Sequence, residues 1–212
     1  VHVLDPFNTT GFGLSSSYNV FDEMAAVLSS DADRPVSYAG TIADALVRTL
    51  STNDSYWDQA AKTYLRGLIL YVFTHEPAER RTLARLRALV SQGDVEGYEK
   101  AVAAGTIEPG KLTPHDVMLA RMRSVADGPY GQAIAAAAGS PVMLGPNERG
   151  GVITTAQEHT SFLDAPEIVR ITGRSDFLLE DLKNGAVSVY VCLPPQMVAG
   201  KEGRWLRMFV LL

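Results

Sequence analysis

Hydrophobic and polar positions follow helical spacing over most of the chain, most clearly between Ser55 and His75. Large apolar residues recur there in steps of three, four and one, which places them on one face of a 3.6-residue helix. The apolar face comprises Trp57, Ala61, Tyr64, Leu65, Leu68 and Val72, widened by Tyr56, Ile69 and Phe73. We expect Asp58, Lys62 and Arg66 to face water. Because so wide an apolar face needs cover, the pattern predicts a core helix surrounded by other helices.

The same spacing predicts shorter helices before and after this segment. They cover residues 19–28, 35–50, 82–90, 95–104, 113–126, 132–138, 147–163 and 166–171, and a further helix opens at Arg204. The start at Thr113 is strongly marked, because a capping residue is followed by Pro114 and by an acid, Asp116, in the first turn. Residues 139–145, which contain glycine and proline, are predicted to break the helical pattern.

Two short apolar runs near opposite ends of the chain have the composition of β-strands. Residues 1–5 precede Pro6, and residues 186–193, rich in β-branched and aromatic side chains, precede Pro194. Two strands do not form a stable sheet alone. Near-continuous apolar strands are typical of parallel sheets that helices cover. We therefore expect a mainly α fold, in which a helical body is inserted into an α/β domain and carries one strand at each end.

Composition restricts the class of protein. Of the 212 residues, 46% are hydrophobic and 20% charged, as in an ordinary globular protein. The net charge of −5 argues against a large nucleic-acid footprint. One cysteine excludes an internal disulfide and is compatible with a reducing cytoplasm. The longest apolar run of the core helix, residues 68–73, is too short to cross a bilayer. Because the chain begins and ends inside apolar patterns, we expect it to be a piece of a longer protein.

Two glycine-rich segments have partial phosphate-binding patterns. From Gly105 to Lys111 the chain matches a phosphate-binding loop, but Leu112 replaces the hydroxyl that would hold Mg²⁺ and a predicted helix precedes the loop. We expect a loop between helices. From Gly11 to Ser16 the pattern resembles a dinucleotide loop without its third glycine. A plain strand-to-helix loop is expected there, and nucleotide binding by this loop with Asp5 is the alternative.

The other titratable residues show no catalytic arrangement. The four histidines lack the i,i+4 spacing and the cysteine neighbours that zinc sites favour. They are His2, His75, His115 and His159. Cys192, in an apolar strand, is expected to be an inert buried thiol. Asp5 lies where an ATPase strand carries its acid, but Pro6 follows, so a turn at the strand end is expected. We predict no catalytic, cofactor-binding or metal-ligating residue in this chain.

One basic cluster stands out in the sequence. It comprises Arg80, Arg81, Arg85 and Arg87, with Glu76 and Glu79 close by. A solvated helix face is the expected interpretation. Contact with an acidic partner, or direct binding of single-stranded DNA by a helical module, is the alternative.

Taken in order, eight segments resemble the TraG-type coupling ATPases of conjugation and type IV secretion. They are VLDPFN (3–8), YNVFDEM (18–24), YWDQAAKTYLRGLILYV (56–72), RTLARLRALV (81–90), GVITTA (151–156), FLDAPEIV (162–169), SDFLLEDLKNGAVSVYVCLPP (175–195) and RWLRMFV (204–210). One departure is Val20-Phe21, where the family typically has Pro-Leu before the acid that is Asp22 here.

The resemblance implies an all-helical domain inserted into a RecA-like motor. Residues 1–18 would be an edge strand and loop of the motor, 19–184 the all-α domain, and 185–212 the returning strand and the start of a helix. The phosphate loop would precede Val1 and the acidic magnesium strand would follow Leu212. ATP and Mg²⁺ are therefore expected for the parent protein and no cofactor for this chain, which would itself catalyse nothing.

The resemblance also implies a role. The helical domain would recognise relaxase–DNA complexes, effectors or adaptors and deliver them to the secretion channel. The parent would be a hexamer anchored at the cytoplasmic face of the bacterial inner membrane, and this chain a monomer without membrane contact. No residue of the sequence identifies the surface that binds the partner.

Overall fold

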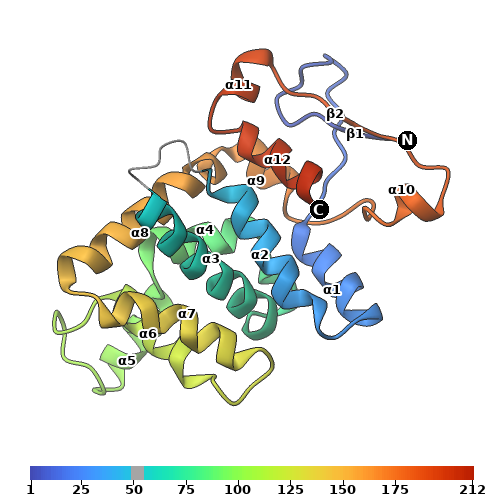
Figure 1. The fold of residues 1–212 in the computed structure, drawn as a ribbon. Helices are drawn as coiled ribbons and strands as arrows, with labels where there is room; N and C mark the ends of the chain where they lie inside the picture. The colour runs from blue at the N-terminus through green and yellow to red at the C-terminus, as the bar shows by residue number, and fades with distance from the viewer. Residues whose placement is uncertain (49–54) are drawn as a thin grey trace.

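The computed structural model describes residues 1–48 and 55–212, which are mainly helical (Figure 1). The helices are α1 (Val20–Ser30), α2 (Arg34–Leu46), α3 (Ser55–His75), α4 (Leu83–Gln92), α5 (Val95–Ala103), α6 (Pro114–Ser124), α7 (Gly131–Met143), α8 (Pro146–Thr160), α9 (Pro166–Ile171), α10 (Asp181–Asn184), α11 (Pro195–Ala199) and α12 (Gly203–Leu211). Residues Ala78–Arg80 and Ser161–Asp164 form 3₁₀ turns, and β1 (His2–Leu4) and β2 (Val189–Val191) are the described strands.

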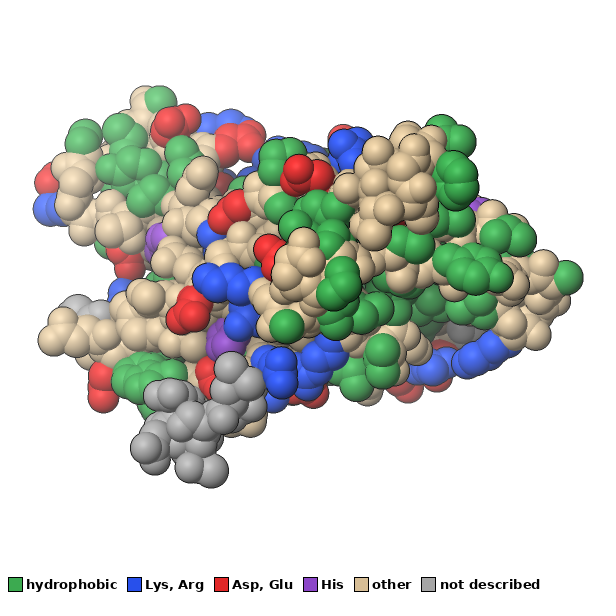
Figure 2. Space-filling view, turned by 90° about the horizontal axis from the view of Figure 1, so that it is seen from above, with side chains coloured by type: hydrophobic (Ala, Val, Ile, Leu, Met, Phe, Trp, Pro, Cys, Tyr) green, Lys and Arg blue, Asp and Glu red, His purple; other side chains and the backbone are tan. Residues whose placement is uncertain are grey.

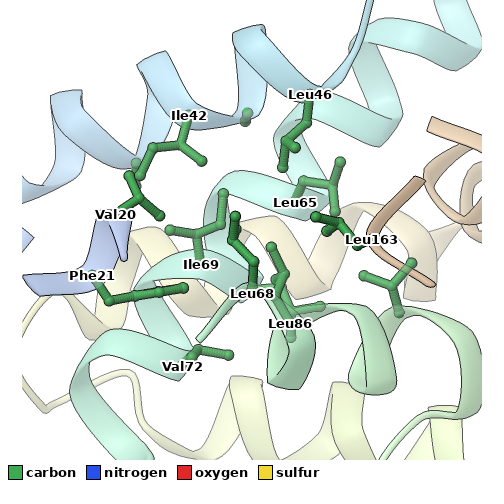
Figure 3. Packing of buried hydrophobic residues seen from close by; sticks show 14 of the residues in the cluster. Val20, Phe21, Ile42, Leu46, Leu65, Leu68, Ile69, Val72, Leu86 and Leu163 are labelled. Carbon is green, nitrogen blue, oxygen red and sulfur yellow. The ribbon is translucent and has the colours of Figure 1, made fainter. Parts of the chain in front are cut away.

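The predicted core helix is confirmed as α3, which packs against α2, α7 and α8. Figure 3 shows side chains of α1, α2 and α4 converging on its apolar face. The α3 residues in that view are Leu65, Leu68, Ile69 and Val72, all fully buried. Burying a side chain of this size stabilises the fold by about 1.5–3 kcal/mol. The helical body is therefore organised around one helix that is covered on several sides.

The expectation that Asp58 faces water is wrong. Its side chain is only 5% exposed, and its Oδ1 lies 2.9 Å from Nε2 of His159 on α8. A buried carboxylate needs such a polar partner. Lys62 is partly covered and pairs with Asp44 of α2 at 3.0 Å. The side of α3 that looks polar in sequence thus carries contacts to α2 and α8.

The two strands pair in parallel, as their apolar composition indicates. His2 lies opposite Val189 and Leu4 opposite Val191, and the Cys192 N–H donates to the Leu4 carbonyl at 2.8 Å. Both strands are shorter than the predicted runs. Helices α1 to α10 lie between β1 and β2 in sequence, although the two strands are neighbours in space. This confirms a mainly α fold with a strand at each end.

The chain enters and leaves the helical body at a single junction. The Ser17 N–H donates to the Asp176 carboxylate at 2.8 Å, and the Asp176 N–H donates to the Ser17 carbonyl at 2.9 Å. Beside them, the Asn19 N–H donates to Oγ of Ser175 at 3.0 Å. These reciprocal bonds hold the outgoing and returning segments together next to the strands.

Several predicted boundaries change. The predicted break at 139–145 is confirmed only at Leu144 and Gly145, because α7 continues through Gly139 and Pro141 to Met143. Pro141 lacks the N–H that would donate to the Ala137 carbonyl, and its buried position in the core outweighs the loss of that bond. The predicted helix 147–163 is α8 followed by a 3₁₀ turn, and α10 and α11 are too short to show a helical period. Helix α2 ends at Leu46; the predicted end at Leu50 lies outside the described residues.

The remaining predicted helices are confirmed within a few residues. Thr113 caps α6 through a capping box with Asp116, as its sequence indicates. Within residues 1–48 and 55–212, no helix combines the length and apolar character needed to cross a membrane.

We predict that Gly67→Ala destabilises the fold. A Cβ at Gly67 would lie 2.2 Å from Cβ of Ala137, so α3 and α7 would have to move apart. Overpacking of this kind typically costs about 1–3 kcal/mol, and urea unfolding measures it. Gly139→Ala on α7 is the matched control, since no atom lies within 4 Å of its Cβ position. Equal stability of the two variants would contradict the close α3–α7 contact.

Candidate functional site

The loop between β1 and α1 is organised by Asp5. One carboxylate oxygen accepts the Thr9 N–H at 2.6 Å, and the other accepts the N–H and Oγ1 of Thr10 at 2.8 and 2.7 Å. The Gly13 N–H donates to Oδ1 of Asn8 at 2.7 Å. Backbone donors that could cradle a phosphate are thus bonded to side chains of the same loop. The loop connects a strand to a helix, as expected.

This loop also lines a cavity of about 600 Å³ beside α9. Arg170 and Arg174 lie in its wall, but Arg170 donates to the Pro6 carbonyl at 3.0 Å and Arg174 pairs with Asp176. The cavity wall also contains the Asp5 carboxylate, which repels an anion. Nucleotide binding here stays the alternative prediction, and it would require the donors around Asp5 to be released.

The second glycine segment lies in the connection between α5 and α6, not after a strand. The Gly110 N–H donates to the Tyr98 hydroxyl at 3.1 Å, and Oγ1 of Thr106 donates to the Ala101 carbonyl at 2.8 Å. Lys111 pairs with Glu108 at 2.8 Å. The expected loop between helices is therefore present, held by its own side chains.

The four histidines lie apart, each in its own surroundings. His159 bonds Asp58, His115 bonds the Val90 carbonyl at 3.1 Å, and His75 stacks on Tyr71. His2 lies against the Phe177 ring. Cys192 follows β2 and is half-buried, which corrects its expected place inside a buried strand. In the described part of the chain, no three potential metal ligands converge.

The arginine cluster connects elements of the fold rather than presenting a free basic face. Arg85 binds Glu76 at 2.6 Å, and the Arg81 Nε donates to the Glu76 carbonyl at 2.9 Å. Arg87 binds both carboxylate oxygens of Asp164, at 2.8 and 2.7 Å. The predicted solvated face is thus wrong for Arg81, Arg85 and Arg87. Arg80, whose side chain is 40% exposed, pairs with Glu76 at 3.4 Å and with Glu96 at 3.1 Å.

Arg87 makes the most extensive of these connections. Its Nη1 also donates to the Gln157 carbonyl at 2.7 Å and to Oγ1 of Thr160 at 3.1 Å. The hydrogen bond from Arg87 lowers the pKa of the Asp164 carboxyl, although partial burial acts in the opposite direction. Arg87 therefore ties α4 to the end of α8. Direct DNA binding by this cluster would compete with these contacts.

The structure also brings one distant cation beside three cations of residues 201–207, and sequence reasoning missed this group. Arg48 follows α2, Lys201 lies between α11 and α12, and Arg204 and Arg207 lie on α12. They line one pocket of about 520 Å³, which we call the basic pocket. The spacing of Lys201, Arg204 and Arg207 was the only available signal, since nothing in the sequence links them to Arg48.

We predict that Asp5→Asn destabilises the chain at neutral pH. Burial alone would raise the pKa of the Asp5 carboxyl, but the hydrogen bonds from Thr10 and Thr9 outweigh it and lower the pKa below 3.8. The charge therefore stabilises the fold above that pH, and the contribution is lost as the pH falls through the folded pKa.

Unfolding by urea at several pH values tests this. We expect a deficit of about 1–2 kcal/mol at pH 7 that shrinks at acid pH, because hydrogen bonds to a charged group are lost. Asp127→Asn, at an exposed site, is the control for the charge change. A deficit that does not change with pH would contradict the role of the carboxylate.

A second prediction compares the contributions of Arg87 and Arg80 to the stability of the fold. Arg87→Gln should destabilise the fold by about 1–3 kcal/mol, because several charge-assisted bonds of a side chain only 13% exposed are lost. Arg80→Gln, with the same charge change, should cost about 0–1 kcal/mol, as exposed ion pairs do. Urea unfolding measures both, and similar losses would show that Arg87 is not a structural connection.

Comparison with known families gives the class of the protein. A family model described as "Type IV secretory system Conjugative DNA transfer" matches residues 1–210, which include both strands and all of the helical body. No curated protein and no solved structure gives a significant match. The match agrees with the resemblance seen in the ordered sequence segments. The chain therefore belongs to the type IV secretory system conjugative DNA transfer family, and its role is in type IV secretion.

Proposed function

We propose that the helical body is the substrate-recognition domain of a coupling ATPase of type IV secretion. It would bind a relaxase–DNA complex, an effector or an adaptor and pass it to the secretion channel. The observation that supports this most is the placement of the body, which is inserted between two adjacent parallel strands of a chain in the conjugative DNA transfer family.

This placement gives the body an attached end and a free end. The attached end comprises β1, β2 and the junction of Ser17 with Asp176. In Figure 1, α5 and the connection to α6 lie at the other end of the molecule. A partner can reach that free end without disturbing the strands, so we assign cargo binding to it.

The free end carries apolar side chains without cover. Leu112, just before α6, is 43% exposed, and Met143, at the end of α7, is 90% exposed. A partner protein that covered these side chains would remove apolar surface from water, which favours association. The connection between α5 and α6 is itself held by the Gly110–Tyr98 bond, so Leu112 is presented from an ordered segment.

The chemical step belongs to other parts of the parent protein in this proposal. ATP and Mg²⁺ would be bound by the motor, and the chain described here would contribute β1 and β2 to it without catalysing hydrolysis. The parent would be a hexamer at the cytoplasmic face of the inner membrane. Cargo bound at the free end would then be held by a domain that is joined directly to the motor through β1 and β2.

Calorimetric titration of the chain against the relaxase, adaptor and effector proteins encoded beside its gene tests the proposal. We expect saturable binding of one of them. The double variant Leu112→Asp, Met143→Asp should weaken that binding at least about tenfold, because it places charge in an apolar contact. Phe12→Asp, at an exposed apolar residue of the β1–α1 loop, is the control for introducing an aspartate elsewhere on the surface and should bind normally.

Thermal melts of both variants should match that of the unchanged chain, since all three side chains are exposed. Binding that the double variant leaves intact would remove the free end as the site. Absence of binding to every one of these proteins would overturn recognition by the helical body itself.

A further inference from the structure

We propose that the basic pocket binds a phosphate group, supplied either by a nucleic-acid strand or by a free nucleotide. The pocket lies at the attached end of the molecule, beside α11 and α12, and not at the free end to which we assign protein cargo. The inference goes beyond the proposed function and does not depend on it.

Three elements bring the four cations together. The end of α2 places Arg48 beside α12, and the Arg207 Nη1 donates to the Val47 carbonyl at 3.4 Å. Helix α12 makes extensive contact with α2, and the fully buried Trp205 anchors α12 in the core. Because Trp205 lies between Arg204 and Arg207 in sequence, its burial holds these two arginines in place on the helix.

The four cations lack the carboxylate partners that nine other cations in the described part of the chain have. Arg80, Arg85, Arg87, Arg121, Arg149 and Arg174 all lie within 4.0 Å of an Asp or Glu oxygen. In the described part of the chain, no carboxylate lies within that distance of the basic pocket's cations. In a chain with net charge −5, this is a concentration of unneutralised positive charge.

The contacts that these cations do make leave donors free. Lys201 Nζ donates to Oγ of Ser161 at 3.3 Å. The Arg204 Nη1 donates to the backbone carbonyls of Glu158 and His159, at 3.3 and 3.1 Å. A guanidinium has five N–H donors and an ammonium three, so most donors in the pocket have no acceptor in the described structure.

Charges around Arg204 agree with this picture. Burial lowers the pKa of Arg204, and the nearby Arg48 lowers it further. Glu158, Asp58 and Glu202 act in the opposite direction without reversing the shift. An anion in the pocket would therefore relieve the mutual repulsion of Arg204 and Arg48.

The shape and chemistry of the pocket favour phosphate. A guanidinium binds two phosphate oxygens at once, in parallel hydrogen bonds, and is weakly hydrated. Gly203, the first residue of α12, also lines the pocket, so the positive end of the helix dipole adds to the field. A volume of about 520 Å³ leaves room for a nucleotide around the phosphate. Figure 2, seen from above, shows Lys and Arg side chains in groups on this face.

Fluorescence anisotropy with a labelled single-stranded DNA oligonucleotide, with ATP and inorganic phosphate as competitors, tests the proposal. The variant Arg48→Gln, Lys201→Gln removes two cations that support little of the fold. The control Arg123→Gln, Lys183→Gln makes the same charge change at exposed sites outside the pocket. Arg204 is left unchanged because it bonds the backbone of α8.

We expect the pocket variant to lose about tenfold in affinity. The slope of log affinity against log salt concentration should also be smaller in magnitude by about 1.4 for this variant, because it loses two phosphate contacts on a single strand. The control should bind within about twofold of the unchanged chain. If ATP or inorganic phosphate displaces the labelled oligonucleotide at matched phosphate concentration, the ligand is a free phosphate compound. If only unlabelled DNA displaces it, the ligand is a nucleic-acid strand.

Three outcomes would overturn the proposal. These are absence of binding to all three phosphate probes, equal loss in the pocket and control variants, and preferential binding of a poly-glutamate peptide. The last would assign the pocket to an acidic protein instead. Binding of protein cargo, measured separately, is unaffected by each of these results, so failure here and failure of the proposed function remain distinguishable.

Discussion

The burial of α3 on several sides is the constraint on which the helical body depends. Helices α2, α7 and α8 all contact it, and its neighbours approach closely only because small residues allow them to. A Cβ at Gly67 would meet Ala137 of α7, and a Cβ at Gly151 of α8 would come within 2.8 Å of the Trp57 ring. Close packing without voids or overlaps is what gives one arrangement of helices instead of several.

Polar contacts then fix the periphery of this core. Asp58 and His159 join α3 to α8 inside it, and Arg87 joins α4 to the end of α8 at its edge. At the junction with the strands, the Leu179 N–H donates to the buried Glu23 carboxylate at 2.7 Å. Each of these bonds links segments far apart in sequence, so together they restrict how the peripheral helices sit on α3.

Sequence periodicity was sufficient for the core and insufficient for these links. The apolar face of α3, the cap at Thr113 and the parallel character of the strands follow from local rules, and the structure confirms them. A polar residue such as Asp58 is assigned to solvent by the same rules, because its partner lies 101 residues away.

The basic residues show the same limit. The sequence pattern assigns Arg87 to solvent, because its partner Asp164 is 77 residues away. The basic pocket likewise forms only when α12 packs against α2. Helix α7 continues past Gly139 for a similar reason, since Pro141 is buried and Val142 packs against the core. Local breaking signals were outweighed there by tertiary packing.

The pairing of β1 with β2 has a consequence for how such a body could vary. Adjacent strands lie about 4.8 Å apart, so the polypeptide departs from the sheet and rejoins it at neighbouring positions. Lengthening, shortening or replacing the intervening helices would leave the strand register unaltered, provided the Ser17–Asp176 closure is kept. The architecture thus allows the helical body to diversify while the sheet that carries it stays the same.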